Sequence, residues 1–253
     1  MKPLLIRIIS LMVGLAAWEV VSRLAPPSVA FLIPGPSKVA IETYGLIVSG
    51  QMLSALAASL MPLAVALLVV LGVGIPYGIL MGISRKVEQV SDFYIYALYA
   101  SPVTALIPVI MLYFGAGFAA KVVVIIIYTV FDVIMILFQG AKNVPASYIE
   151  VAESMGARNL QIFTKVVMWH LLPYILTAVR IALGRGIRGM IVAELLISAT
   201  GLGWLISAYS AALRIDAVLG VAIVIMIMGI GVQELIKRLE SRLMPWAEMY
   251  YRR

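Results

Sequence analysis

The chain has 253 residues, of which 63% are hydrophobic and 12% charged, and its mean hydropathy is +1.08. Such an apolar composition excludes a soluble domain, and the absence of Cys excludes disulfides and thiolate chemistry. Lys and Arg outnumber Asp and Glu by 19 to 12. We interpret this excess as a signal of membrane orientation rather than of nucleic-acid binding, because no basic cluster is interleaved with aromatic residues. The composition predicts an all-α integral membrane protein.

Apolar segments long enough to cross about 30 Å of hydrocarbon occur along the whole chain. Each is expected to be helical, because unpaired strand backbone cannot lie in lipid. The first segment could be a signal peptide, but no small-residue cleavage site precedes Trp18, so we expect a retained span. The six expected spans are residues 4–24, 55–82, 93–114, 121–140, 172–197 and 217–236.

Two of these spans carry residues that affect helix packing. Gly74, Gly78 and Gly82 recur every fourth residue on one face of the second span, which predicts close packing against another helix. Pro102 and Pro108 each remove a helical hydrogen bond from the third span and should kink it. Such a kink is typical of a helix beside a cavity or a moving joint, although a simple packing irregularity remains the alternative.

The basic residues are distributed unevenly about the expected spans. This asymmetry places both termini in the cytoplasm, makes residues 141–171 the longest cytoplasmic loop and makes residues 25–54 the longest external loop. The external side has Arg23, Lys38, Lys121 and Arg214. The cytoplasmic side has Lys2, Arg7, Arg85, Lys86, Lys142, Arg158, Lys165, Lys237, Arg238, Arg242, Arg252 and Arg253.

The segment 145–173 in the cytoplasmic loop is too polar to span the membrane. Ser147 lies three residues before Glu150, as in a capping box, so we expect a helix that begins at Ser147. Gly156 is a suitable place for this helix to end. The helical repeat gives it one shallow face, suited to contact with another protein, that contains Ile149, Ala152, Glu153 and Gly156. An amphipathic surface helix with no partner is the alternative.

This segment resembles the cytoplasmic EAA loop of ABC importer permeases, whose pattern is Glu-Ala-Ala, a spacer, Gly, a longer spacer and Ile-x-Leu-Pro. Glu150, Ala152 and Gly156 match that pattern. The residues that depart from it are Val151, Val166, Met168 and Trp169. Leu172-Pro173 is similar to a second Leu-Pro that one branch of the family carries.

The resemblance extends over nearly the whole chain and indicates the nitrate, sulfonate, taurine and bicarbonate branch of these permeases. Each matching segment is short, but their order and spacing together are specific to the family. The segments are IPGPSKV at 33–39, ALIP at 105–108 followed by YFG at 113–115, ALGRG at 182–186, VAE at 192–194, GLGWL at 201–205 and RLMPW at 242–246.

The resemblance implies a type I ABC importer permease in a single domain, residues 1–253, located in the inner membrane. Two ATPase subunits that bind ATP and Mg²⁺ would be its partners, together with a second copy of the permease and an external solute-binding protein. The binding protein would dock over the loops at 25–54 and 198–216 and deliver a small organic or inorganic anion. The ATPase-coupling residues would be Glu150, Ala152, Glu153 and Gly156.

The sequence lacks the motifs of an enzyme. A phosphate-binding loop requires Gly-Lys before Ser or Thr, and no Gly-Lys pair occurs in the chain, so we expect ATP hydrolysis to come from a partner. Gly115-Ala116-Gly117 is expected to be a turn, and the single His170 lacks companions for a metal site. We also expect no cofactor in this chain. The alternative function is an ion-coupled secondary carrier, which should show paired inverted halves.

Several charged residues lie within the expected spans. Asp132, Arg185, Arg188 and Glu194 would each cost several kcal/mol facing lipid, so we expect them to face the protein interior. In the related permeases Arg and Glu are usual at the positions of Arg185 and Glu194, whereas Arg188 and Asp132 are unusual. Arg188 could therefore attract an anionic solute, although Asp132 and an Arg could simply pair. The substrate-pathway candidates are Ser101, Thr104, Arg185, Arg188 and Glu194.

Overall fold

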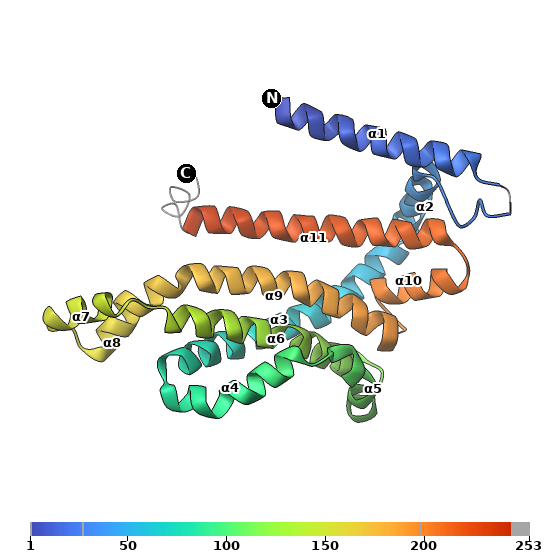
Figure 1. Ribbon diagram of the computed structural model, residues 1–253. Helices are drawn as coiled ribbons and strands as arrows, with labels where there is room; N and C mark the ends of the chain where they lie inside the picture. The colour runs from blue at the N-terminus through green and yellow to red at the C-terminus, as the bar shows by residue number, and fades with distance from the viewer. Residues whose placement is uncertain (1, 27, 198, 244–253) are drawn as a thin grey trace. The chain divides into compact units, whose positions relative to one another are not determined.

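The computed structural model describes residues 2–26, 28–197 and 199–243, and no strand occurs in these ranges. Its helices are labelled along the chain in Figure 1. The chain forms two compact units, which we describe separately. Unit 1 contains Met1–Leu60 with Ser198–Met228, and unit 2 contains Met61–Ile197 with Gly229–Arg253. The predicted basic ends Arg252 and Arg253, and most of the RLMPW segment, lie outside the described residues.

Among the described residues, five helical segments are long and apolar enough to cross a membrane. They confirm five of the six expected spans, with ends that differ by several residues. The segments are Leu5–Leu24 in α1 (Lys2–Leu24), Gln51–Ile83, which is α3, Phe118–Lys142, which is α6, Asn159–Ile197, which ends in α9 (Met168–Ile197), and Ile215–Arg242 in α11 (Ile215–Leu243).

The expected third span is two helices, which corrects the prediction of one kinked helix over 93–114. α4 (Arg85–Ala100) and α5 (Val103–Phe114) are bent by 98° at the break between them. Pro102 causes the break, because it holds the preceding residue in an extended conformation, and Ser101 has ψ 138°. α5 continues through Pro108, so the bend lies at Pro102 alone.

The core of unit 2 is formed by α6 and α9, which lie along each other (Figure 1). The glycine face predicted on α3 is confirmed, because it packs against α6 without room for side chains. A β-carbon on Gly78 would lie 2.6 Å from the carbonyl oxygen of Ile134, and one on Gly82 would lie 2.5 Å from the Ala141 β-carbon. The absence of side chains thus lets the two helix backbones approach closely.

Unit 1 contains a helix within the predicted external loop 25–54 that the sequence reasoning missed, α2 (Pro36–Val48). Pro36 suits the first helical position, and the Glu19 carboxylate of α1 serves the free amides there. The Ser37 amide donates to Glu19 Oε2 at 3.2 Å, and the Ser37 hydroxyl donates to Glu19 Oε1 at 2.9 Å. Gly35 leaves room for this carboxylate, because a β-carbon there would lie 2.6 Å from Oε2.

A second unexpected helix, α10 (Leu202–Ala211), lies in the predicted external loop 198–216 of unit 1. Gly201 precedes it with φ 105°, a conformation that favours glycine. The Leu202 amide donates to the buried Ser59 hydroxyl at 2.9 Å, and the Tyr209 hydroxyl donates to Gln51 Oε1 at 2.7 Å. These bonds join the described part of the 198–216 loop, residues 199–216, to α3.

The predicted cytoplasmic loop folds into short helices at one end of unit 2 (Figure 1). They are α7 (Ala146–Ser154), α8 (Asn159–Ile162) and a π-helical turn, η1 (Phe163–Val167), which leads into α9. The helix continues through Trp169, and Pro173 lies inside α9. α7 packs against α8 and η1, so the loop has its own tertiary contacts.

Candidate functional site

The ends of α7 are set by two different devices. Its predicted end at Gly156 is confirmed: Gly156 has φ +77°, its amide bonds to the Glu153 carbonyl at 2.8 Å, and the Ala157 amide bonds to the Ala152 carbonyl at 3.0 Å. This pair of bonds is a Schellman motif, which requires a left-handed residue. The predicted capping box is wrong. Pro145 is the N-cap residue, with no side-chain cap, because the helix begins at Ala146 and places the Ser147 side chain inside its first turn.

The faces of α7 differ from the face that the sequence predicted. Ile149 and Ala152 are half-buried, whereas Glu150, Glu153 and Gly156 are exposed. The predicted coupling residues therefore lie together on α7 and on the Gly156 turn that ends it, but they do not form one uniform face.

An exposed apolar ridge on α7 was missed by the sequence reasoning. Tyr148, Val151 and Met155 have 56%, 59% and 82% of their surface exposed. They follow one another at three- and four-residue steps, so their side chains line one stripe of the helix. That spacing was the signal in the sequence. We call these three residues the α7 ridge.

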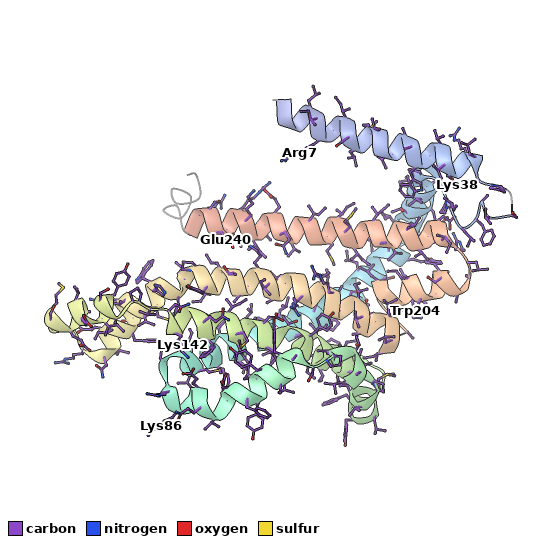
Figure 2. The ribbon with its side chains drawn as sticks, in the orientation of Figure 1. Arg7, Lys38, Lys86, Lys142, Trp204 and Glu240 are labelled. Carbon is purple, nitrogen blue, oxygen red and sulfur yellow. The ribbon has the colours of Figure 1, made fainter. Side chains whose placement is uncertain are left out.

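Basic residues gather at the same end of unit 2 as the α7 ridge. Lys86, near the start of α4, and Lys142, at the end of α6, are labelled in Figure 2. Lys142 forms an ion pair with Glu88 of α4, which joins the two helix ends. A cluster of cations at one end of membrane helices is the usual mark of their cytoplasmic end.

A cavity of about 230 Å³ lies at the α4–α5 bend in unit 2. The sequence candidates Ser101, Thr104 and Arg185 line it together with Asp132. The two hydroxyl residues that flank Pro102 thus share a cavity with the Arg185 cation of α9 and the Asp132 anion of α6. The other lining residues are Leu98, Tyr99, Pro102, Val103, Ile127, Tyr128 and Phe131.

The two charged groups of the cavity form an ion pair. Arg185 Nη2 lies 3.1 Å from Asp132 Oδ1, and the side chains are 42% and 10% exposed. The alternative that Asp132 pairs with an Arg is therefore confirmed, and the partner is Arg185. Arg188 does not line the cavity.

Glu194 and Arg188 occupy other places on α9. Glu194 is fully buried and pairs with Lys121 of α6, with Nζ to Oε1 at 3.3 Å. Lys121 lies near the start of α6, which begins at Phe118, and its side chain is buried. Arg188 is exposed on the isolated chain, so the expectation that it faces the interior of this chain is wrong. None of the ion pairs among the described residues includes Arg188.

The part of the chain that the structure describes holds no group of three metal-ligating side chains. His170 lies beside the Tyr174 ring, with ring centroids 5.8 Å apart. Its neighbour is thus an aromatic ring rather than a second ligand. The arrangement offers ionic and hydroxyl contacts for a small solute, and a helical surface for a protein partner.

The helices, the broken pair and the polar cavity between them define a multi-pass membrane permease. The chain belongs to the family described as "Binding-protein-dependent transport system inner membrane component", whose profile matches residues 74–245. It is 30% identical over 236 residues to the putative aliphatic sulfonates transport permease protein of Bacillus subtilis, covering 93% of this chain and 85% of that one. It is 33% identical over 243 residues to the taurine transport system permease protein of Escherichia coli, covering 94% and 88%.

A nitrate import permease protein of Leptolyngbya laminosa is 30% identical over 191 residues, covering 75% of this chain and 68% of that one. These relatives confirm the sulfonate, taurine and nitrate branch of the ABC importer permeases. The fold is similar to a chain of the MetNI methionine ABC transporter, solved in inward-facing conformations, with a TM-score of 0.58 and 17% identity. That likeness covers 74% of this chain and 95% of the other, and it confirms the permease fold.

Proposed function

We propose that this chain is the membrane subunit of an ATP-driven importer, which carries a small solute with an anionic group into the cytoplasm. An external binding protein delivers the solute, and a separate ATPase subunit drives alternation between outward- and inward-open states. The chain itself hydrolyses no ATP and needs no cofactor. Both termini lie in the cytoplasm.

The α7 ridge is the observation that carries this proposal. It leaves three large apolar side chains exposed at the basic end of the membrane helices, outside the long apolar spans. Apolar groups gathered at such a place mark a surface for a protein partner. An ATPase subunit that receives α7 in a cleft would bury the ridge and contact Glu150 and Glu153 at its side.

The test compares two variants at Gly156. Gly156→Trp adds a ring where a β-carbon meets no other atom of the chain within 4 Å, so the ring can project toward a partner. Gly156→Ala is the matched control, because both variants place a β-carbon on a residue with φ +77° and share the same strain. We expect the tryptophan variant to lose most of its co-purifying ATPase while the alanine variant keeps it, with normal amounts of both in the membrane.

A second pair of variants probes the ridge itself. Val151→Asp places a charge within the apolar ridge, and Val151→Thr keeps the shape of the side chain without the charge. Reduced ATPase binding by Val151→Asp alone supports a buried ridge. Full coupling of ATP hydrolysis to uptake in both Gly156→Trp and Val151→Asp would show that α7 is not the coupling element.

Arg188 supports a second copy of the permease. A charge halfway along a membrane helix is costly in lipid, so the face of α9 that exposes Arg188 should be covered by protein or should line water. A two-fold dimer with the pathway at its interface meets both requirements. We expect Arg188→Ala to lower uptake while the dimer persists and the ATPase of the assembled transporter keeps its basal hydrolysis, which chemical crosslinking and an ATPase assay would check.

The external loops support docking of a binding protein. Unit 1 joins the two predicted loops through the Tyr209–Gln51 bond and through an ion pair between Arg214 and Glu42. Trp204 and Tyr209 line a cavity of about 410 Å³ in the same unit (Figure 2 labels Trp204). One continuous external surface is therefore available. An ion-coupled carrier would need neither partner, so a permease that transports without ATPase would contradict the proposal.

A further inference from the structure

The cavity at the α4–α5 bend combines opposite charges at the middle of the expected membrane spans. Asp132 is the fifteenth residue of α6 (Phe118–Lys142), and Arg185 lies eighteen residues into α9 (Met168–Ile197). Their side chains meet at 3.1 Å, and both line the cavity. The chemistry of this pair bears on which solutes the proposed importer moves, so the inference rests on the proposed function.

The two sides of the cavity suit two different solute groups. Arg185, the Thr104 hydroxyl and the amino-terminal end of α5 supply positive charge and hydrogen-bond donors for an anionic group. Asp132 and the carboxyl-terminal end of α4 supply negative charge for a cationic group. The rings of Tyr99, Tyr128 and Phe131 also line the cavity, and ring faces attract ammonium groups.

The existing ion pair disfavours a solute that carries an anion alone. Such a solute either lies beside the Asp132 carboxylate, which repels it, or displaces Asp132 from Arg185 and leaves that mostly buried carboxylate without a cation. An unpaired buried charge is strongly unfavourable. A solute that carries both charges replaces each partner of the pair, so neither protein group is left alone.

The size of the cavity limits the solute to a small one. A volume of about 230 Å³ equals roughly eight waters at about 30 Å³ each. A molecule of similar size has room for one anionic group, a short carbon chain and one amine. We propose that the α4–α5 cavity binds small zwitterions, with the anionic group at Arg185 and the ammonium group at Asp132.

Solute binding to the purified permease–ATPase complex in lipid nanodiscs tests the inference. The external binding protein is left out, so that its own selectivity does not enter. In one experiment, unlabelled taurine and ethanesulfonate, which lacks only the amine, are compared by the concentration at which each displaces radiolabelled taurine. In a second experiment, β-alanine and propionate are compared in the same way. We expect at least one zwitterion to compete at a concentration about tenfold or more below that of its amine-free analogue.

Variants of the pair should change this preference in opposite directions. Asp132→Asn should reduce zwitterion affinity about tenfold or more and bring ethanesulfonate level with taurine. Arg185→Gln should weaken binding of taurine and of ethanesulfonate, because both carry a sulfonate group. It should favour ethylammonium, which carries only the ammonium group, over ethanesulfonate. Thr129→Val is the matched control, because Thr129 is buried on α6 one turn from Asp132 and does not line the cavity. It should leave the preference unchanged.

Equal competition by both members of each solute pair in the parent protein would overturn the inference, as would the absence of saturable binding. Retention of the parent preference in Asp132→Asn would also overturn it. If that variant fails to fold, the comparison of solutes on the parent protein still decides. Failure of the proposed function is distinguishable, because it appears as a permease that retains no ATPase rather than as a changed solute preference.

Discussion

The buried ion pair between Lys121 and Glu194 provides the sharpest prediction about stability. Lys121→Met removes the cation and leaves the Glu194 carboxylate, whose side chain is 0% exposed, facing the resulting gap. The Lys121 side chain is itself only 4% exposed, so water is poorly placed to replace it. Breaking a buried pair by removing one partner costs about 3–5 kcal/mol, and we expect a loss in this range.

Adding Glu194→Gln to Lys121→Met should restore much of the lost stability, because a neutral amide costs less to bury than a carboxylate that has lost its cation. The assay is equilibrium unfolding of the purified permease in mixed micelles, carried out on the parent, both single variants and the double variant. We expect a coupling free energy above about 1 kcal/mol between the two sites. A loss below about 1 kcal/mol for Lys121→Met, or strictly additive effects, would refute the reasoning.

Two further predictions concern backbone positions. Gly78→Ala should lower the free energy of unfolding by about 1–3 kcal/mol, because its β-carbon would lie 2.6 Å from the Ile134 carbonyl oxygen. Gly72→Ala is the control and should leave the free energy of unfolding unchanged, because its β-carbon meets no atom within 4 Å. A stable Gly78→Ala protein in the same unfolding assay would contradict the packing described for α3. Leu213→Gly should stabilise the protein by about 1 kcal/mol, because Leu213 has φ +56°, a left-handed conformation that is costly for Leu. Ala212→Gly is its control, and equal effects of both variants would show that strain at Leu213 is not the cause.

The elements that the sequence predicted correctly depend on local properties. Hydropathy over a long window located the spans, because lipid demands a continuous apolar helix whatever its neighbours are. Gly156 was recognised as a helix end because a left-handed residue favours glycine by itself. The glycine face of α3 was readable for a similar reason, since a four-residue repeat lies on one side of any helix.

The errors arose where local signals competed. Ser147 and Glu150 fit a capping box, but Pro145 precedes them and starts the helix two residues earlier than that box requires. Pro102 and Pro108 gave equal signals for a bend, and the break occurred only at Pro102. α2 and α10 were missed because they are short helices within external loops, without the length of a span.

By itself the sequence determined the class of protein and the positions of five spans, because these follow from hydropathy and from local motifs. Only the tertiary structure decided which charges meet. Arg185 and Arg188 are three residues apart on α9, yet only Arg185 pairs with Asp132, and Lys121 is buried against Glu194. Ion pairs between helices depend on how the two helices are rotated and shifted against each other, and that alignment is set by the packing of all their side chains together.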